Sequence, residues 1–356
     1  MNDKYIYSIG LMSGTSLDGL DIVYVKFHKK DYSDFEIIHS NTIKYSEFWE
    51  ARLKNSIHLD TELLSVLDYD YGQYLGNKTQ EFISKNKITS LDFIASHGHT
   101  VLHQPDKGIT FQVGDGQQIY NITKSTTVSD FRTQDVQLGG QGAPLVPIGD
   151  RILFSEYEAC LNLGGFANIS YEYGDKRIAF DICPVNIVMN YYCKKIGLDY
   201  DDKGVIASKG TVHEGLLEDL NSLDYYLKKP PKSLGLEWVC QFVYPLLDDY
   251  NLDVEDVLRT FTEHISQQIS IIIHPFNNVL FTGGGAYNDF LLKRIQIHSN
   301  TQIILPPDDI INYKEALIFS LLGVLKIHDK INCLSSVTGA KINHSSGKIF
   351  NQNISD

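Results

Sequence analysis

The chain has 356 residues, of which 43% are hydrophobic and 21% charged, values usual for a soluble globular protein. At about 150 residues per domain, this length predicts two domains. The formal net charge of −13 argues against a nucleic-acid partner, because phosphate backbones bind basic faces. The five cysteines form no C-x-x-C pair, which indicates reduced thiols. With no leader-like N-terminus and no run of about 20 apolar residues, we expect a cytoplasmic protein with no membrane partner.

The first motif is the stretch 8–21, where an apolar strand runs into a polar turn and a second strand follows over 22–27. The turn carries Gly14, Thr15, Ser16, Asp18 and Gly19. Amides and hydroxyls in such a turn form a cup for anionic oxygens. A carboxylate beside a phosphate needs a divalent cation or a water between them. We therefore interpret the turn as a phosphate and Mg²⁺ site, with an ordinary polar turn as the alternative.

The rest of the first half alternates strand and helix patterns. Strands are expected at 35–39, 91–96 and 109–113, with a helical region over 47–85 whose start signals include Asp60. Three strands, then a helix and a strand, open a mixed α/β domain. Dense glycines at 139–142 mark a sharp turn or a close approach of the backbone. We place the crossover between the domains near these glycines.

The second half repeats the opening pattern. The expected strands are 159–163, 167–171, 178–181, 279–281 and 302–305, and the expected helices include 254–273, 288–297 and 315–327. Each half begins with three strands joined by short turns, which predicts a duplicated domain. We expect the first domain to cover 1–130 with a returning segment at 315–356, and the second to cover 131–314.

Four glycine-rich turns follow strands, at 14–19, 114–116, 164–165 and 283–285. Several such turns in a two-domain chain indicate a nucleotide bound in a cleft between the domains. None of them matches a Walker A motif or a G-x-G-x-x-G fingerprint, so the sequence supports neither a P-loop nor a Rossmann fold.

In combination, these motifs resemble the signature of the anhydro-N-acetylmuramic acid kinases. The segments that carry the resemblance are 12–19, 96–100, 103–105, 112–115, 130–132, 139–147, 162–168 and 283–288. That family belongs to the actin, sugar-kinase and Hsp70 ATPase (ASKHA) superfamily, so the resemblance implies a two-domain α/β fold with ribonuclease-H-like halves and an interdomain cleft. It implies an ATP-dependent kinase that phosphorylates O6 of 1,6-anhydro-N-acetylmuramic acid while water opens the anhydro bond, giving N-acetylmuramic acid 6-phosphate for cell-wall sugar recycling. It also implies a homodimer.

The resemblance assigns roles to individual residues. Asp181 is the expected base that activates water, as in inverting glycosidases, with a helix cap as its alternative. Asp18 would hold Mg²⁺ through water. The expected ATP-binding residues are Gly14, Thr15, Ser16, Asp18, Gly19, Gly164, Gly165, Gly283, Gly284, Gly285 and Asn288. The expected sugar-binding residues are His97, Gly98, Asp115, Asp130, Arg132, Asp135, Gln141 and Glu315.

Two of these sugar-site assignments have alternatives that are purely structural. The guanidinium of Arg132 suits a bidentate contact with the lactyl carboxylate, but a structural ion pair with Asp130 or Asp135 is an alternative. Glu315 either reaches the sugar or favours the helix dipole as a first-turn acid. The spacing of His97, His99 and His103 is similar to a metal-ligand set, but no acidic or cysteine cluster lies nearby in the sequence, and we do not expect a transition metal there.

One segment departs from the family pattern. The family reads Asp-Thr-Gly-Pro-Gly-Asn after the strand, and this chain reads Asp-Ile-Cys-Pro-Val-Asn at 181–186. Glycine allows a close approach of the backbone that Cys183 and Val185 restrict. A smaller variation lies at 200–204, in the order of Asp and Lys. The family activity therefore has two alternatives. The protein is either a kinase for a related sugar or a sensor that binds nucleotide and sugar without catalysis.

Overall fold

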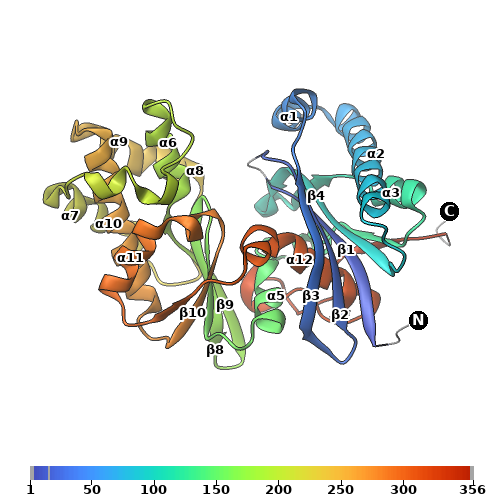
Figure 1. The fold of residues 1–356 in the computed structure, drawn as a ribbon. Helices are drawn as coiled ribbons and strands as arrows, with labels where there is room; N and C mark the ends of the chain where they lie inside the picture. The colour runs from blue at the N-terminus through green and yellow to red at the C-terminus, as the bar shows by residue number, and fades with distance from the viewer. Residues whose placement is uncertain (1–3, 15–16, 353–356) are drawn as a thin grey trace. The chain divides into compact units, whose positions relative to one another are not determined.

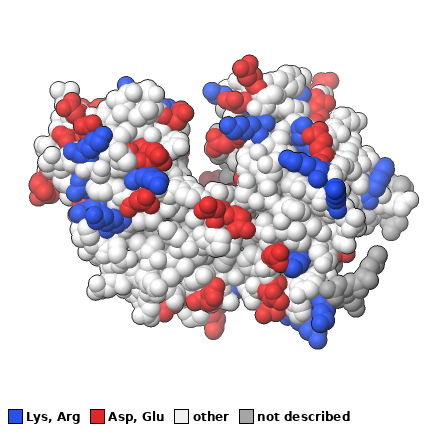
Figure 2. Space-filling model, viewed as in Figure 1, with Lys and Arg blue, Asp and Glu red and all other residues white. Residues whose placement is uncertain are grey.

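The computed structural model describes residues 4–14 and 17–352. The chain divides into two compact units, which are described separately (Figure 1). The first unit comprises Met1–Ser155 and Tyr313–Asp356, and the second comprises Glu156–Asn312. Among the described residues, no helix is both long enough and apolar enough to cross a membrane. On the face drawn in Figure 2, acidic and basic side chains are interspersed.

The boundary between the units differs from the expected one. We placed it at 130/131, and the structure places it at 155/156, while the return to the first unit begins at 313 where we expected 315. The segment 131–155 packs on the first unit: Arg132 donates to His97, and a side chain at Gly149 would meet Ile318. The glycines at 139–142 therefore mark a loop within the first unit, since glycine density reports a tight backbone and not a domain boundary.

The first unit is built on one sheet with the order β12-β6-β4-β1-β2-β3, and β5 pairs with the far end of β4. Strands β1 to β3 form an antiparallel meander, and β4 and β6 run parallel to β1. The strands are β1 (Tyr5–Ser13), β2 (Leu20–His28), β3 (Asp31–Ile43), β4 (Phe93–Gln104), β5 (Ile109–Val113), β6 (Thr127–Ser129) and β12 (Lys348–Phe350).

Helices cover both faces of this sheet (Figure 1). Successive side chains of a strand point to opposite faces. In β1, Ile9 and Leu11 join the core beneath α2, while Gly10 faces α12, where any side chain would collide with the carbonyl of Ala316. The helices of this unit are α1 (Glu47–Lys54), α2 (Thr61–Lys85), α3 (Gly116–Thr123), α4 (Thr133–Gln137), α5 (Val146–Leu153) and α13 (Ser335–Thr338), and α12 (Asp308–Ile327) begins in the second unit and continues here.

The single helical region expected over 47–85 is two helices joined by a 3₁₀ turn at Ser56–His58. The predicted start signal explains the break, because the carboxylate of Asp60 accepts a hydrogen bond from the amide of Leu63 at 2.9 Å. That contact caps α2 and fixes its first turn.

The second unit has a five-stranded sheet with the order β11-β10-β7-β8-β9. Its strands are β7 (Ala159–Leu163), β8 (Phe166–Tyr173), β9 (Lys176–Pro184), β10 (Asn278–Thr282) and β11 (Gln302–Ile304). Its helices are α6 (Asn186–Lys195), α7 (Glu214–Asn221), α8 (Leu236–Trp238), α9 (Tyr244–Asp249), α10 (Val254–Ile273) and α11 (Asp289–His298). The expected amphipathic helix is α10, whose apolar stripe of Val257, Phe261, Ile265 and Ile269 lies in the core.

The two sheets share one topology, which confirms the predicted duplication. In each, the first three strands are antiparallel neighbours, and two later strands add in parallel beside the first. The order β3-β2-β1-β4-β6 in the first unit thus corresponds to β9-β8-β7-β10-β11 in the second. The α/β class and the two-part organisation predicted from the sequence are confirmed.

Candidate functional site

The turn between β1 and β2 carries the first group of predicted phosphate contacts. Thr15 and Ser16 lie outside the described residues. Asp18 is exposed in a bend. Burial raises the pKa of the nearby Asp21, the hydrogen bond from the Thr42 hydroxyl opposes this rise, and the charge of Asp18 adds to it. A side chain at Gly19 would meet the carbonyl oxygen of Ile43 at 2.7 Å, so this position requires glycine.

A chain of hydroxyl groups anchors the base of this hairpin. The Ser13 hydroxyl lies 2.9 Å from Nδ1 of His99 on β4, and it accepts a hydrogen bond from the Tyr45 hydroxyl at 2.7 Å. Tyr45 in turn lies 2.6 Å from the hydroxyl of Tyr71 on α2. Burial lowers the pKa of His99 to about 4, so its ring is neutral. These contacts fix the end of β1 against β4 and α2. His99 is thereby a structural partner of Ser13.

Arg132 and His97 form a polar pair that is held on both sides. Nε of Arg132 donates to Nε2 of His97 at 2.9 Å, and Nη1 donates to the carbonyl of Gly142 at 2.6 Å. Because a guanidinium only donates, Nδ1 of His97 carries the ring proton and donates to the carbonyl of Gly98 at 3.0 Å. Burial, and then the charge of Arg132, hold the pKa of His97 well below its usual value.

The third guanidinium nitrogen of Arg132, Nη2, has no hydrogen-bond partner among the described residues, so it can donate to a ligand. Burial lowers the pKa of Arg132 to about 10, an effect that the charge of Glu315 opposes. Glu315 itself is exposed on α12. The guanidinium therefore remains charged at neutral pH and is held by two of its three nitrogens.

Asp135 is fully buried, and its carboxylate faces protein. One oxygen accepts from the amide of Gly142 at 2.7 Å, and the other accepts from the Thr338 hydroxyl at 2.7 Å and the Cys333 thiol at 3.0 Å. A side chain at Gly140 would collide with the same carboxylate. These contacts differ from the direct sugar contact expected for Asp135, because a sugar bound at the surface cannot touch a carboxylate that has no exposed surface. Asp135 instead positions the loop that holds Arg132.

The remaining predicted sugar contacts are spread over this part of the first unit. Gly98 has a φ of +72° and packs on the carbonyl of Val113, and the side chain of Gln141 is exposed. Asp115 caps α3 by accepting from the amide of Gln117 at 2.9 Å. Asp130 has a φ of +56° and forms an ion pair of 2.7 Å with Lys348. Asp130 therefore forms a structural ion pair, which was the alternative to a sugar contact, but its partner is Lys348 and not Arg132.

The glycine turns of the second unit meet at the ends of β7 and β10. A side chain at Gly283, whose φ is +82°, would lie 2.6 Å from the Asn162 side chain, and one at Gly285 would lie 2.7 Å from Leu163. The carbonyls of Gly164 and Gly165 accept from the amides of Asn186 and Val185, at 3.3 and 2.8 Å. The backbone of the 164–165 turn is thereby joined to the start of α6.

A cavity of about 590 Å³ opens beside these turns, and its walls come entirely from the second unit. Its lining includes the predicted residues Gly284, Gly285 and Asn288. The side chain of Asn288 caps α11 by accepting from the amide of Leu291 at 3.0 Å. The rest of the lining is Asn186, Met189, Asn190, Tyr200, Asp201, Asp202, Lys203, Tyr287, Asp289 and Asn312. The volume lies within the range of about 300–1,000 Å³ that small-molecule sites occupy.

Asp181 lies half-buried on β9. Its Oδ2 accepts from the amide of Leu234 at 2.8 Å, and its own carbonyl accepts from the Tyr225 hydroxyl at 2.6 Å. Burial raises the pKa of Asp181, and the Leu234 hydrogen bond partly opposes this. Because α6 begins at Asn186 with Val185 as its N-cap, Asp181 caps no helix, and the structural alternative for this residue is excluded.

Comparison with known proteins decides the family. The family model of anhydro-N-acetylmuramic acid kinase matches residues 6–352. The chain belongs to the anhydro-N-acetylmuramic acid kinase family. Proteins of that name from Francisella tularensis and Vibrio cholerae are each 33% identical to this chain, over 95% and 98% of it and 97% and 99% of their own lengths. Among solved structures, an activator of 2-hydroxyisocaproyl-CoA dehydratase from Clostridium difficile aligns with a TM-score of 0.43 at 14% identity, over 89% of this chain and 93% of that chain.

The departure from the kinase family's glycine pattern lies inside the protein. Cys183 and Val185 are both fully buried in the core of the second unit, and neither has a positive φ. Their side chains belong to the core of the second unit, whereas Asp181 is only partly buried. Asn186, which the kinase pattern keeps, donates to the carbonyl of Leu163 at 3.4 Å and lines the cavity.

Sequence reasoning missed one wall of the cavity and one carboxyl beside a predicted glycine turn. The first is the cavity wall at 200–203, where the variation in the order of Asp and Lys was the available signal. The second is Asp68 on α2, which accepts from the amide of Gly114 at 2.7 Å and whose pKa burial raises to about 6. Asp68 lies 46 residues before Gly114, within a helix pattern that gives no sign of this contact.

Proposed function

We propose that this protein is an ATP-dependent kinase that phosphorylates O6 of 1,6-anhydro-N-acetylmuramic acid while water opens its anhydro bond, giving N-acetylmuramic acid 6-phosphate. The observation that carries the proposal is the family match over 6–352, together with a cavity built by the same glycine turn that the family motif marks. The proposed location is the cytoplasm, and the proposed assembly is a homodimer, as the resemblance implies.

The adenosine part of ATP is assigned to the cavity of the second unit. Gly284 and Gly285 present backbone without side chains to it, and the nearest atom to a side chain built on Gly284 is Nδ2 of Asn186, at 3.9 Å. Tyr200 and Tyr287 offer aromatic surfaces for a base. The free space beside the backbone of Gly284 can therefore accommodate part of a nucleotide.

The phosphates are assigned to the glycine turns that follow β1 and β7. The residues proposed for them are Gly14, Thr15, Ser16, Gly19, Gly164 and Gly165. Asp18 is proposed to hold Mg²⁺ through water, and its exposed carboxylate is the donor type that this ion prefers. When bound, Mg²⁺ would neutralise charge on the phosphates.

The sugar is assigned to Arg132 and the residues around it. Nη2 of Arg132 is available to pair with the lactyl carboxylate, and His97 and Gly142 hold the other two nitrogens. Glu315, Gln141, Asp130 and Gly98 are proposed as further neighbours of the sugar. Asp135 and Asp115 are proposed to position the loop and helix that carry these groups.

Asp181 is proposed as the general base. It takes a proton from water, whose oxygen bonds to C1, and the electrons of the C1–O6 bond pass to O6. O6 then bonds to the γ-phosphorus, and ADP leaves. Burial of the carboxylate raises its pKa and so makes it a stronger base, while the amide of Leu234 holds one oxygen in place.

The test measures ADP release and product mass with 1,6-anhydro-N-acetylmuramic acid and ATP, comparing the native chain with Asp181→Asn. We expect the variant to lose about 100- to 10,000-fold in kcat, the usual contribution of general acid–base catalysis. Asp175→Asn is the matched control, because Asp175 is exposed in the β8–β9 turn that leads into the same strand. No ADP release from the native chain would overturn the kinase. A phosphorylated product with an intact anhydro ring would overturn the coupled hydrolysis.

A further inference from the structure

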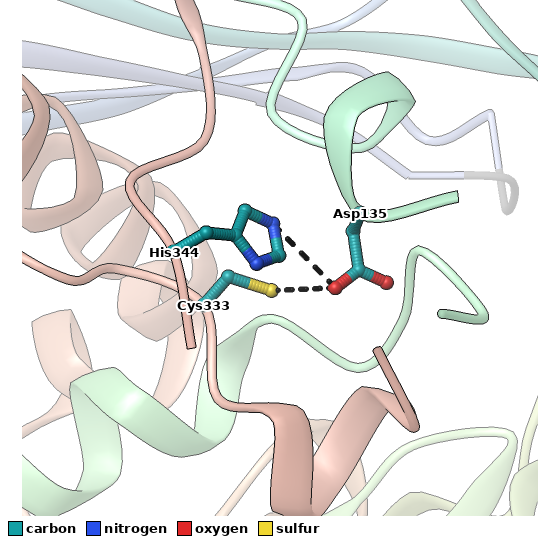
Figure 3. Close-up of side chains that lie close together, drawn as sticks. All are labelled: Asp135, Cys333 and His344. Atoms are coloured by element: carbon teal, nitrogen blue, oxygen red, sulfur yellow. Dashed lines mark hydrogen bonds and ion pairs between the residues drawn. The ribbon is translucent and has the colours of Figure 1, made fainter. Parts of the chain in front are cut away.

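A second polar cluster lies in the first unit, formed by Asp135, Cys333 and His344 (Figure 3). Their relative exposures are 0%, 1% and 6%, so all three are buried. The Cys333 sulfur lies 3.0 Å from Oδ1 of Asp135, and Nε2 of His344 lies 3.6 Å from the same oxygen. The three potential ligand atoms all lie within 4.8 Å of one another. Two anionic ligand types and an imidazole thus meet at one point inside the protein.

The hydrogen bonds of His344 leave one ring nitrogen unsatisfied. Nδ1 lies 3.1 Å from the carbonyl oxygen of Ile342, which only accepts, so Nδ1 carries the proton and donates. Nε2 is then a lone pair that faces the carboxylate oxygen of Asp135, and it is buried with no hydrogen-bond partner among the described residues. The opposite tautomer would place a lone pair against the Ile342 carbonyl. A cation between Nε2 and Oδ1, either a proton on Nε2 or a metal ion, removes the conflict.

We propose that Asp135, Cys333 and His344 bind one Zn²⁺ ion. Zinc takes four ligands in a tetrahedron with bonds of about 2.0–2.3 Å, which puts neighbouring ligand atoms roughly 3.3–3.8 Å apart. The distance of 3.6 Å from Nε2 of His344 to Oδ1 of Asp135 lies within this range, and the distance of 3.0 Å from the Cys333 sulfur to the same oxygen lies a few tenths of an ångström below it. A carboxylate, a thiolate and a neutral imidazole together carry two negative charges, which Zn²⁺ balances. Binding releases the thiol proton to solvent, and a water is the fourth ligand.

The surroundings already hold each ligand in place, as the outer contacts of metal sites do. The Thr338 hydroxyl and the Gly142 amide donate to the carboxylate of Asp135. Cys333 and His344 face each other in an antiparallel bridge, with reciprocal backbone hydrogen bonds of 3.1 and 3.2 Å. The Ile342 carbonyl fixes the imidazole. A bound ion would cross-link the 333–344 segment to α4.

The test uses the full chain, stripped with a chelator and titrated with ZnCl₂ against a chromophoric competitor. We expect one Zn²⁺ per chain. With CoCl₂ in place of zinc, we expect a thiolate-to-cobalt charge-transfer band. Cys333→Ser should abolish the band and weaken zinc binding by more than the roughly 10- to 100-fold lost when an outer-shell partner is removed. His344→Gln should keep the band and weaken binding. Cys240→Ser is the matched control, because Cys240 is an exposed free cysteine in the second unit.

Several outcomes would overturn the zinc site. These are the absence of saturable Zn²⁺ binding, a cobalt complex without the thiolate band, a Cys333→Ser variant that binds as tightly as the native chain, or a band that Cys240→Ser removes. Circular dichroism shows whether each variant is folded. If Cys333→Ser does not fold, the cobalt spectra of the native chain and of Cys240→Ser decide the question, because a band retained in both supports the site and its absence from either refutes it. All these readouts are independent of kinase activity.

Discussion

Replacing His97 with phenylalanine tests how Arg132 is held. The ring of His97 packs on Phe319 with centroids 4.6 Å apart, and phenylalanine preserves that packing. The substitution removes the nitrogen that accepts the Nε hydrogen of Arg132 at 2.9 Å. Only the contact of Nη1 with the Gly142 carbonyl would then hold the guanidinium.

Two magnitudes follow from this geometry. Losing a hydrogen bond to a charged group costs about 1.5–3 kcal/mol, so we expect the free energy of unfolding to fall by roughly that amount. An arginine side chain carries about 2 kcal/mol of rotamer entropy, and a sugar that must order Arg132 on binding loses up to that much. At about 1.4 kcal/mol per factor of ten, the sugar KM should rise by up to roughly 30-fold. The KM for ATP should not change.

The assay is steady-state kinetics with each substrate varied, and urea unfolding followed in parallel. Arg132→Lys completes a double-mutant cycle, because lysine keeps the charge but lacks the planar fork that contacts His97 and Gly142 together. If His97 acts through Arg132, adding His97→Phe to Arg132→Lys should raise the sugar KM no further. Additive effects on KM, or an equal rise in the KM for ATP, would refute the reasoning.

Gly283→Ala should raise the KM for ATP and lower stability by more than about 1 kcal/mol, because it combines a φ of +82° with a contact of 2.6 Å to Asn162. Gly174→Ala, with a φ of +58° and nothing within 4 Å, is its control, and equal effects in both would attribute the loss to φ alone. Stability should also fall on acidification. Burial lowers the pKa of His99 to about 4 and that of His264 to about 3, so below about pH 6.5 the unfolded chain binds protons that the folded chain does not. Each histidine should then remove up to roughly 1.4 kcal/mol per pH unit, and urea midpoints of His264→Gln that keep the full slope would contradict this.

Much of the fold could be predicted because its signals are local. The stripe of α10 (Val254–Ile273) and the start of α2 at Asp60 are periodicity and capping effects that operate within a few residues. The repeated pattern of three strands in each half was enough to predict the duplicated sheet. The domain boundary was not predictable in this way, because 131–155 belongs to the first unit through packing, and its glycines gave no indication of which unit it joins.

The family, the two α/β halves and the turns that carry the glycine motifs can be predicted without a structure, because each depends on short runs of residues. The directions in which the polar side chains face depend on the packing of segments that are far apart in the chain. Asp135 and Cys333 are 198 residues apart, and their contact exists because the C-terminal segment packs against α4. As a result, the carboxylate of Asp135, which we expected at the sugar, is a buried acceptor of hydrogen bonds from Gly142, Thr338 and Cys333. Arg132, three residues before Asp135, is held by His97 and by the Gly142 carbonyl, which leaves its third nitrogen for a ligand.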